Sequence, residues 1–141
     1  MITIDKITTT EALEWAFEIR KKVFVIEQQV DPAEEYDEFE VVSTHYLAFQ
    51  DGHPVGTARW RTTDQGVKLE RFAVLEGARN EGVGTHLVKR CLQDIPKDQG
   101  KIYLHAQIQV IPFYELLGFE VSGEEFIEAN IRHKKMIYKE A

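Results

Sequence analysis

The chain has 141 residues and a formal net charge of −7, a length typical of one domain and a charge that argues against broad binding to nucleic acid or to an anionic membrane. A single cysteine allows no internal disulfide, and no run approaches the roughly 20 apolar residues that would span a bilayer. Because no signal-like apolar segment begins the chain, we expect one cytoplasmic domain over residues 1–141, whose charge suits a cationic partner.

The N-terminal part predicts a strand and then a helix. Residues 2–7 alternate apolar and polar side chains, Thr8 to Glu11 offer a capping box, and a broad apolar stripe follows as far as Phe24. The run from Asp31 to Glu40 carries six carboxylates around Pro32 and predicts a loop or short helix that is exposed to water. These carboxylates either form a solvated face or attract a primary amine.

An antiparallel meander of three strands is expected next. The predicted strands are residues 45–50, 55–62 and 67–75, and the turns between them are residues 51–54 and 64–66. Arg59 and Arg61 alternate along the middle strand, so both face one side and could bind an acidic acceptor. An acidic acceptor and an amine are opposite substrates, and the sequence leaves both open.

The second half predicts a loop, two helices and three further strands. In chain order these are the loop 79–85, a helix to Ile95, a strand over 102–106, a helix from Ile111 or Pro112 to Gly118, and strands over 119–121 and 133–138. Pro96 ends the first helix, and Gly118 can cap the second. The whole order predicts an α/β domain with a mixed, mostly antiparallel central sheet flanked by helices.

The loop from Arg79 to Thr85, with the sequence RNEGVGT, has the layout of a cradle for an anion. Gly82 and Gly84 have no Cβ, so their backbone amides can approach a ligand, and the following helix adds a partial positive charge of roughly half a unit. The Lys-Ser/Thr pair of a Walker loop is missing, and the dinucleotide motif needs a third glycine. The alternative is that the two glycines only form a tight turn.

The pattern Arg-x-x-Gly-x-Gly resembles the pyrophosphate loop of the GNAT superfamily of acetyl-CoA-dependent acyltransferases. Glu70 to Leu75 resembles the fourth strand of that family, and Pro112 to Phe119 resembles its later FYxxxGF segment. Arg20 to Gln28 and residues 123–133 are similar to the small YjcF/ElaA-like branch. The resemblance implies the GNAT fold over nearly the whole chain, acetyl-CoA as the acyl donor, and a small-molecule amine as the acceptor.

The same resemblance assigns residues to the cofactor. Backbone groups of Phe72, Ala73 and Val74 would pair with the pantetheine as if it were another strand. The pyrophosphate would lie on Arg79, Asn80, Glu81, Gly82, Val83, Gly84 and Thr85. Gln107 stands where many relatives have an asparagine that touches coenzyme A, so this contact departs from the family pattern.

Two residues are candidates for catalysis. The resemblance places Tyr114 beside the sulfur of coenzyme A, where a phenol can protonate the leaving thiolate; the alternative is a core aromatic beside Phe113. The period of a strand predicts that Glu70 shares a face with Phe72 and Val74, so it could take the proton of the amine through water. Glu70 could also be half of a solvated charge pair, with water alone as the base.

His45, His105 and His133 lack the spacing of a zinc site, so we expect no metal, and Cys91 is expected in the core. His133 lies in the segment that resembles the YjcF/ElaA-like branch, and this resemblance suggests a role near the acceptor. The prediction is an N-acetyltransferase that transfers the acetyl group directly to an amine in a ternary complex. The alternative is a non-catalytic acyl-CoA-binding or regulatory module. The identity of the acceptor and the oligomeric state, including a homodimer, stay open.

Overall fold

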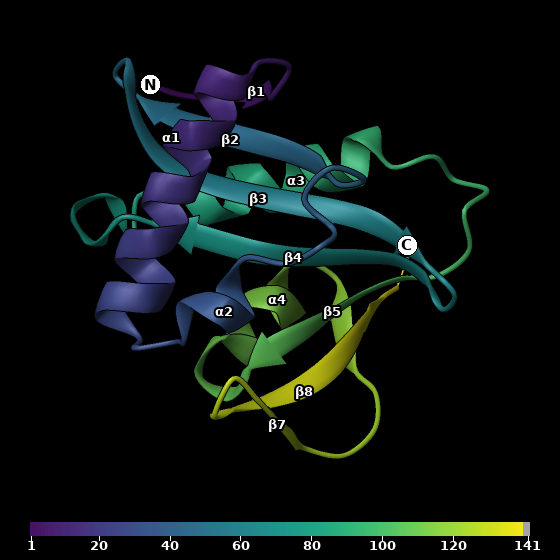
Figure 1. Ribbon diagram of the computed structural model, residues 1–141. Helices are drawn as coiled ribbons and strands as arrows, with labels where there is room; N and C mark the ends of the chain where they lie inside the picture. Colours follow the sequence, from purple (N-terminus) through teal and green to yellow (C-terminus); the bar gives the residue numbers. More distant parts are fainter. Residues whose placement is uncertain (140–141) are drawn as a thin grey trace.

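The computed structural model describes residues 1–139 and contains one eight-stranded sheet with the order β1-β2-β3-β4-β5-β8-β6, in which β7 also pairs with β8 (Figure 1). The strands are β1 (Ile2–Lys6), β2 (Thr44–Gln50), β3 (His53–Thr63), β4 (Gly66–Val74), β5 (Ile102–Gln107), β6 (Phe119–Val121), β7 (Phe126–Glu128) and β8 (Ile131–Tyr138). Only β4 and β5 pair in parallel within the described residues. The predicted mixed, mostly antiparallel sheet is therefore confirmed.

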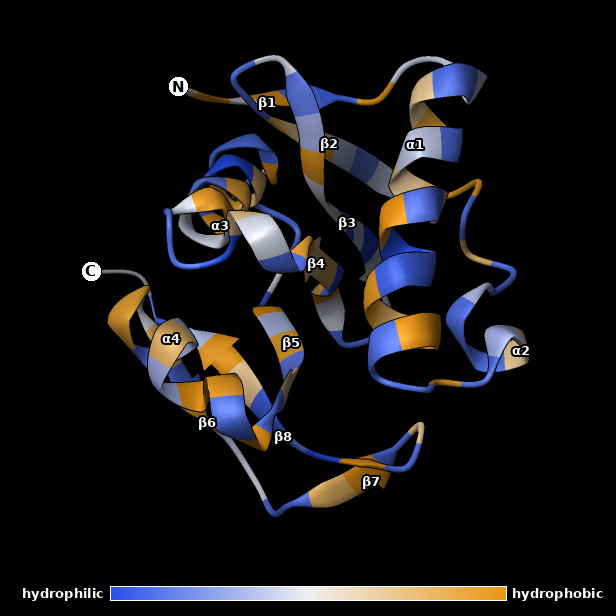
Figure 2. Ribbon diagram, turned by 90° about the vertical axis from the view of Figure 1, so that its left-hand side faces the viewer, coloured by the Kyte–Doolittle hydropathy of each residue, from blue (hydrophilic) through white to orange (hydrophobic). Residues whose placement is uncertain are grey.

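Helices cover both faces of this sheet. They are α1 (Thr10–Arg20), its π-helical continuation η1 (Lys21–Glu27), α2 (Pro32–Glu35), the 3-10 turn η2 (Glu76–Ala78), α3 (Val83–Asp94), the 3-10 turn η3 (Ile108–Val110) and α4 (Ile111–Leu116). Figure 2 shows α1 and α2 on one side of the sheet, which we call the front face, and α3 and α4 on the other, the back face. None of the helices within residues 1–139 is long and apolar enough to cross a membrane.

The apolar core lies in two layers, one on each face of the sheet. The larger layer packs α3 and α4 against the back face and includes Leu87, Leu104 and Met136, which are almost fully buried. The smaller layer packs α1 against the front face and includes Ile19 and Leu47. Because helices cover both faces, the middle strands of the sheet are buried from two sides.

A β-bulge in β4 changes which side chains face which layer. Thr57 lies opposite Ala73 and Arg59 lies opposite Glu70, so β4 has one more residue than β3 between these two pairs. The extra residue is Arg71, whose φ of 59° lies in the left-handed region. Residues after Arg71 therefore alternate in the opposite phase to residues before it.

The predicted shared face of Glu70, Phe72 and Val74 is wrong for this reason. Phe72 and Val74 pack with the back layer, whereas Ala73 packs with α1 at the front. Glu70 lies opposite Arg59 and faces the front. A plain period of two cannot describe a strand that contains a bulge.

The parallel pair of β4 and β5 is short, and this opens the sheet. Pairing runs only from Val67 opposite Ile102 to Leu69 opposite Leu104, after which the two strands diverge (Figure 1). The last five residues of β4 and the last three of β5 thus border an opening through the sheet.

Candidate active site

A cavity of about 950 Å³ occupies the opening between β4 and β5. All of the site residues predicted from the sequence line this cavity except Glu81, which is exposed to solvent outside it. These lining residues are Glu70, Phe72, Ala73, Val74, Arg79, Asn80, Gly82, Val83, Gly84, Thr85, Gln107 and Tyr114. The structure therefore brings together segments that lie up to 44 residues apart in the sequence, from Glu70 to Tyr114.

The loop from Arg79 to Thr85, which we call the glycine loop, places the first turn of α3 at the cavity. Gly82 precedes the helix with a φ of 93°, a conformation that other residues adopt only at a cost, and it has no side chain to cap the helix. The first helical hydrogen bond is donated by His86 N to Gly82 O (3.0 Å), so the amides of Val83, Gly84 and Thr85 come before it. These amides and the helix dipole make the loop a suitable site for a phosphate.

Arg79 ties this loop to its surroundings. Its Nε donates to the carbonyl oxygen of Val74 (2.9 Å), and its two Nη atoms donate to Glu27 at 2.6 and 2.7 Å. The hydrogen bond and the charge of Arg79 lower the pKa of the Glu27 carboxyl. The end of η1 is thereby joined to the loop across the mouth of the cavity.

Gln107 is also engaged at both ends of its side-chain amide. Its Nε2 donates to Gln28 Oε1 (3.0 Å), and its Oε1 accepts from Gln109 Nε2 (2.7 Å). Gln28 belongs to the turn after η1, so this is a second link from the front helix to a strand end. The side chain of Gln107 orders the end of β5 in this arrangement.

Tyr114 reaches the cavity from α4 on the back face. Its ring packs edge to face against Phe72, Phe113 and Phe119, and the residue is 7 % exposed. Within residues 1–139, no fully buried side-chain polar atom lacks a hydrogen-bond partner, and no partner is present for the Tyr114 hydroxyl. The hydroxyl therefore contacts the cavity. Burial raises the pKa of Tyr114, so the group holds its proton at neutral pH.

Glu70 enters the cavity from the front and is held by cations. Its carboxylate accepts hydrogen bonds from Arg59 Nε and Arg61 Nε, both at 2.7 Å, and lies 3.4 Å from Lys68 Nζ. Burial alone would raise the pKa of Glu70, but the charge of Arg59 and the bond from Arg61 outweigh it and lower this pKa. The alternative of a solvated charge pair between Glu70 and Arg71 is wrong, because Glu70 is buried and Arg71 binds Asp37 instead.

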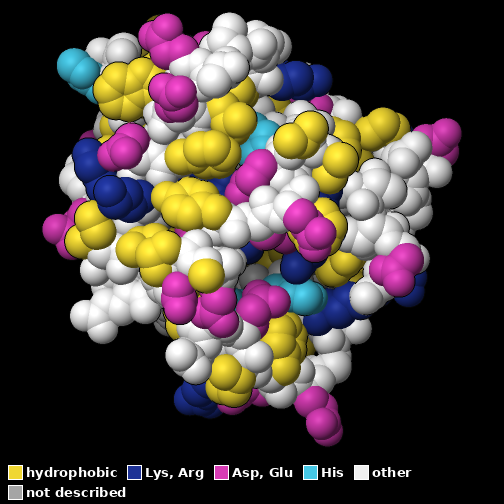
Figure 3. Space-filling view, in the orientation of Figure 1, with side chains coloured by type: hydrophobic (Ala, Val, Ile, Leu, Met, Phe, Trp, Pro, Cys, Tyr) yellow, Lys and Arg dark blue, Asp and Glu magenta, His cyan; other side chains and the backbone are white. Residues whose placement is uncertain are grey.

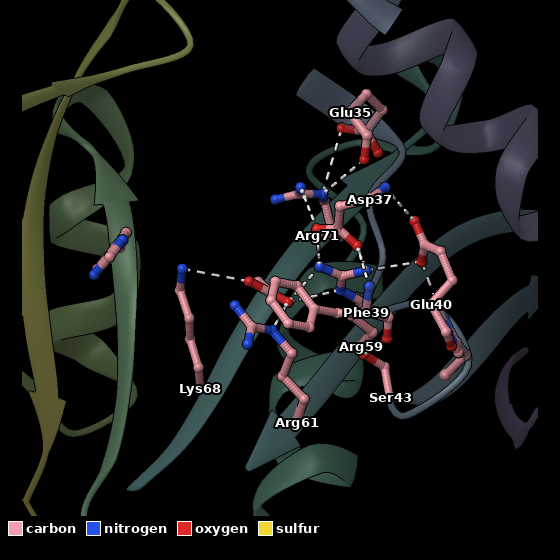
Figure 4. Close-up of polar contacts among 12 residues, drawn as sticks. Glu35, Asp37, Phe39, Glu40, Ser43, Arg59, Arg61, Lys68 and Arg71 are labelled. Atoms are coloured by element: carbon pink, nitrogen blue, oxygen red, sulfur yellow. Dashed lines mark hydrogen bonds and ion pairs between the residues drawn. The ribbon is translucent and has the colours of Figure 1, made fainter. Parts of the chain in front are cut away.

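Arg59 is the centre of a buried ion-pair network (Figure 4). Its guanidinium donates four hydrogen bonds, from Nε to Glu70, from Nη1 to Asp37 and to Glu40, and from Nη2 to Asp37, and Nη2 also forms an ion pair with Glu70. The residue is fully buried. The prediction that Arg59 and Arg61 could together receive an acidic acceptor is therefore wrong for Arg59.

The acidic run after η1 supplies this network. Arg20 binds Glu35 and Glu40, and Asp37 binds Arg59 at 2.7 Å. Burial would raise the pKa of Asp37, but Arg59 lowers it to about 2. For Glu35, Asp37 and Glu40 both interpretations of the run are wrong, because these carboxylates are neither solvated nor free to attract an amine. Arginine side chains from other elements, far away in the sequence, decide their role. The other three carboxylates of the run, Asp31, Glu34 and Glu38, are exposed, as a solvated face requires.

A hairpin that sequence patterns did not predict completes the front of the cavity. β7 and β8 are joined by Ala129 and Asn130, both with positive φ, so the turn lacks the usual glycine. The hairpin brings Glu128 to His105, whose Nδ1 lies 3.2 Å from Glu128 Oε1. Asn130 was the one local signal for it. No group of side chains in the described part of the chain is arranged to hold a metal ion.

Comparison with known proteins agrees with this geometry. A profile of the acetyltransferase (GNAT) domain family matches residues 8–140. YjcF of Bacillus subtilis (strain 168), an uncharacterized N-acetyltransferase, is 42 % identical over 130 residues, which are 90 % of this chain and 92 % of YjcF. The solved structure of Escherichia coli ElaA matches with a TM-score of 0.86 and 26 % identity over 99 % of this chain and 100 % of ElaA.

A more distant solved structure contains the expected donor. This GNAT family acetyltransferase from Elizabethkingia anophelis, with acetyl-CoA bound, matches with a TM-score of 0.64 and 19 % identity over 96 % of this chain and 94 % of that protein. The predicted fold, the resemblance to the YjcF/ElaA-like branch and the acyltransferase class are confirmed by the family match and the closer relatives. The chain belongs to the GNAT acetyltransferase family.

Proposed function

We propose that this protein transfers the acetyl group of acetyl-CoA directly to an amine of a small-molecule acceptor in a ternary complex. The observation that carries the proposal is the cavity that opens through the sheet between β4 and β5. Its back is lined by the glycine loop and Tyr114, and its front by Glu70 and the β7–β8 hairpin. A donor and an acceptor can therefore occupy opposite ends of one cavity and meet without an acyl-enzyme.

The donor would be held by backbone groups. The amides at the start of α3 suit the pyrophosphate. On the β5 side, no strand of residues 1–139 pairs with the end of β4, which suits the pantetheine as an added strand. Arg79 and Gln107 contribute mainly by ordering the loop and the end of β5, because their side chains already have partners.

Tyr114 would act as the general acid. When the bond between carbon and sulfur breaks, coenzyme A leaves as a thiolate, and a phenol that keeps its proton at neutral pH can supply it. Glu70 is a weaker candidate for the base, because a carboxylate held by Arg59, Arg61 and Lys68 binds a proton poorly. Water ordered beside Glu70 is the alternative base within this proposal.

The donor site is tested by calorimetry with acetyl-CoA on Gly84→Asp. A Cβ at Gly84 would lie 3.3 Å from Phe113, and the added carboxylate would face the pyrophosphate. Since juxtaposed like charges cost several kcal/mol, affinity should fall by at least about tenfold. Gly77→Asp is the matched control, because nothing lies within 4 Å of a Cβ there. Equal affinities in the two variants would contradict the loop assignment.

The reaction is tested by release of free thiol with a panel of amines. Replacing Tyr114 by Phe should lower kcat by about 10²–10⁴, the usual contribution of a general acid, with acetyl-CoA affinity unchanged. An unchanged kcat would remove Tyr114 from the mechanism. Tight binding of acetyl-CoA without thiol release from any amine would favour the non-catalytic module. The cytoplasmic location and a homodimer stay predictions.

A further inference from the structure

The carboxylates that line the cavity differ in how they are neutralised. Four of them are bound to arginine: Glu27, Glu35, Asp37 and Glu70. Glu34 is exposed on α2. Glu128 lines the front of the cavity, and in residues 1–139 its partners within 4 Å are two imidazoles, of His105 and His133. Glu128 is thus a lining carboxylate that no lysine or arginine of the described chain occupies.

The front of the cavity gathers charges of both signs around this residue. Figure 3 shows histidine, basic and acidic side chains together over β5 on this face. The hydrogen bond from His105, together with the charge of Lys68, lowers the pKa of Glu128 to about 2. Lys68 also lies within 4 Å of Glu70, so its positive charge acts on both Glu70 and Glu128. The side chain of Glu128 is 45 % exposed and ionised at neutral pH.

His133 stands beside Glu128 with its ring orientation fixed. Its Nδ1 lies 2.7 Å from the carbonyl oxygen of Ile131, and a carbonyl only accepts, so Nδ1 carries the proton of the neutral ring. The ring is stacked on Phe126 at a centroid distance of 5.8 Å and an angle of 16°. Nε2 therefore holds the free lone pair, 3.9 Å from Glu128 Oε2, in a residue that lines the cavity.

We infer that Glu128 binds the ammonium group of a primary amine acceptor and that His133 Nε2 removes its proton, an inference that rests on the proposed acetyl transfer. An ammonium can donate to Glu128 Oε2 and to His133 Nε2 together, because these atoms are 3.9 Å apart. The acceptor class is thus a primary alkylammonium ion rather than a carboxylate.

The proton and electron pairs balance as follows. The ammonium gives one proton to Nε2, and the imidazolium later passes it to solvent. The nitrogen lone pair attacks the thioester carbonyl, a C–N bond forms, the C–S bond breaks, and Tyr114 protonates the thiolate. The second proton of the nitrogen returns to Tyr114 through water. One ammonium and one thioester give one amide, one thiol and one proton.

Binding is tested by titrating the protein with n-butylammonium chloride and following the imidazole signals of His105 and His133 by NMR. Both should shift in the wild type, and the shifts should be lost in Glu128→Gln, whose amide oxygen can still accept from His105. Glu125→Gln is the matched control, because Glu125 lies in the same segment and pairs with the exposed Arg132. Equal shifts in Glu128→Gln would overturn the ammonium site.

Proton transfer is tested by thiol release with n-butylamine across pH. His133→Asn should lower kcat by about 10²–10⁴ with little change in KM, and the acid limb of the kcat profile should disappear. Glu128→Gln should instead raise KM. The charged groups that line the front of the cavity together with His133 are Glu128 on β7, His105 on β5, and Lys68 and Glu70 on β4. The same limb must therefore persist in His105→Asn. A wild-type kcat and acid limb in His133→Asn would overturn its role.

Failure of the proposed acetyl transfer and failure of the roles inferred for Glu128 and His133 give different results. If no amine releases thiol while butylammonium still shifts the His133 signal, the acetyl transfer and the base role fall, and the ammonium site stands. If thiol release is normal in both Glu128→Gln and His133→Asn, the proposed function stands and this inference fails. Calorimetric binding of acetyl-CoA should be unchanged in both variants, which confirms that they fold.

Discussion

Replacing Arg59 by Met should destabilise the protein more than any exposed ion pair can. The guanidinium is fully buried and pairs with three carboxylates, those of Asp37, Glu40 and Glu70. Methionine fills much of the same volume, so the change removes charge and hydrogen bonds more than packing. The three carboxylates would be left close together in a place that water reaches poorly.

The loss of unfolding free energy in Arg59→Met depends on which cations remain beside the three carboxylates. Breaking a buried ion pair by removing one partner costs about 3–5 kcal/mol. Each carboxylate keeps at least one cation, because Glu70 still has Arg61 and Lys68, Asp37 still has Arg71, and Glu40 still has Arg20. We therefore expect the low end, about 3 kcal/mol, out of a total unfolding free energy of about 5–15 kcal/mol for a domain.

Urea denaturation at neutral pH measures this loss. Arg132→Met is the control, because Arg132 also donates two hydrogen bonds to a carboxylate, that of Glu125, but its side chain is 66 % exposed. The unfolding midpoint of this variant should stay close to that of the wild type. If Arg59→Met does not fold, Arg59→Lys should fold with a smaller loss, since it keeps the charge without the planar fork. A loss below about 1 kcal/mol in Arg59→Met, the range of exposed pairs, would refute the reasoning.

Two further predictions concern the same framework. The pKa of Asp37 is lowered to about 2, so this group adds stability above its unfolded pKa of about 3.9 and loses it as the pH falls towards 2. In Asp37→Asn, the urea midpoint should fall less steeply with decreasing pH between about 3.9 and 2 than in the wild type. An unchanged pH dependence would contradict this role of Asp37. Gly82→Ala should cost about 1–2 kcal/mol because φ is 93°. Gly77→Ala is the control, because a Cβ there meets nothing within 4 Å, and it should not lower stability. Equal urea midpoints for the two variants would contradict the backbone strain expected in Gly82→Ala.

Local patterns predicted the strands, the helix after the glycine loop and the loop itself, because each depends on neighbours in the sequence. The meander from β2 to β4 and the loop from Gly82 to Thr85 are examples. Their signals are alternation, turn residues and glycine without Cβ, all of which act over a few residues.

Other features depend on partners far away in the chain. Three carboxylates of the acidic run, Glu35, Asp37 and Glu40, are paired with Arg20 or Arg59, and no local pattern in the sequence predicts either arginine as a partner. The turn of the β7–β8 hairpin uses Ala129 with positive φ, against the preference of alanine. Pairing along β8 stabilises that strained turn, and tertiary contacts of this kind cannot be read from local sequence.

The bulge at Arg71 reverses the alternation of side chains along β4, so substitutions before and after it affect opposite faces of the sheet. Lys68 and Glu70 face the front, whereas Phe72 and Val74 face the back. In the proposed enzyme, substitutions before Arg71 would alter which amine is accepted, and those after it would alter how the donor is held. A lineage could thus exchange acceptors through one half of a single strand while the other half preserves the donor.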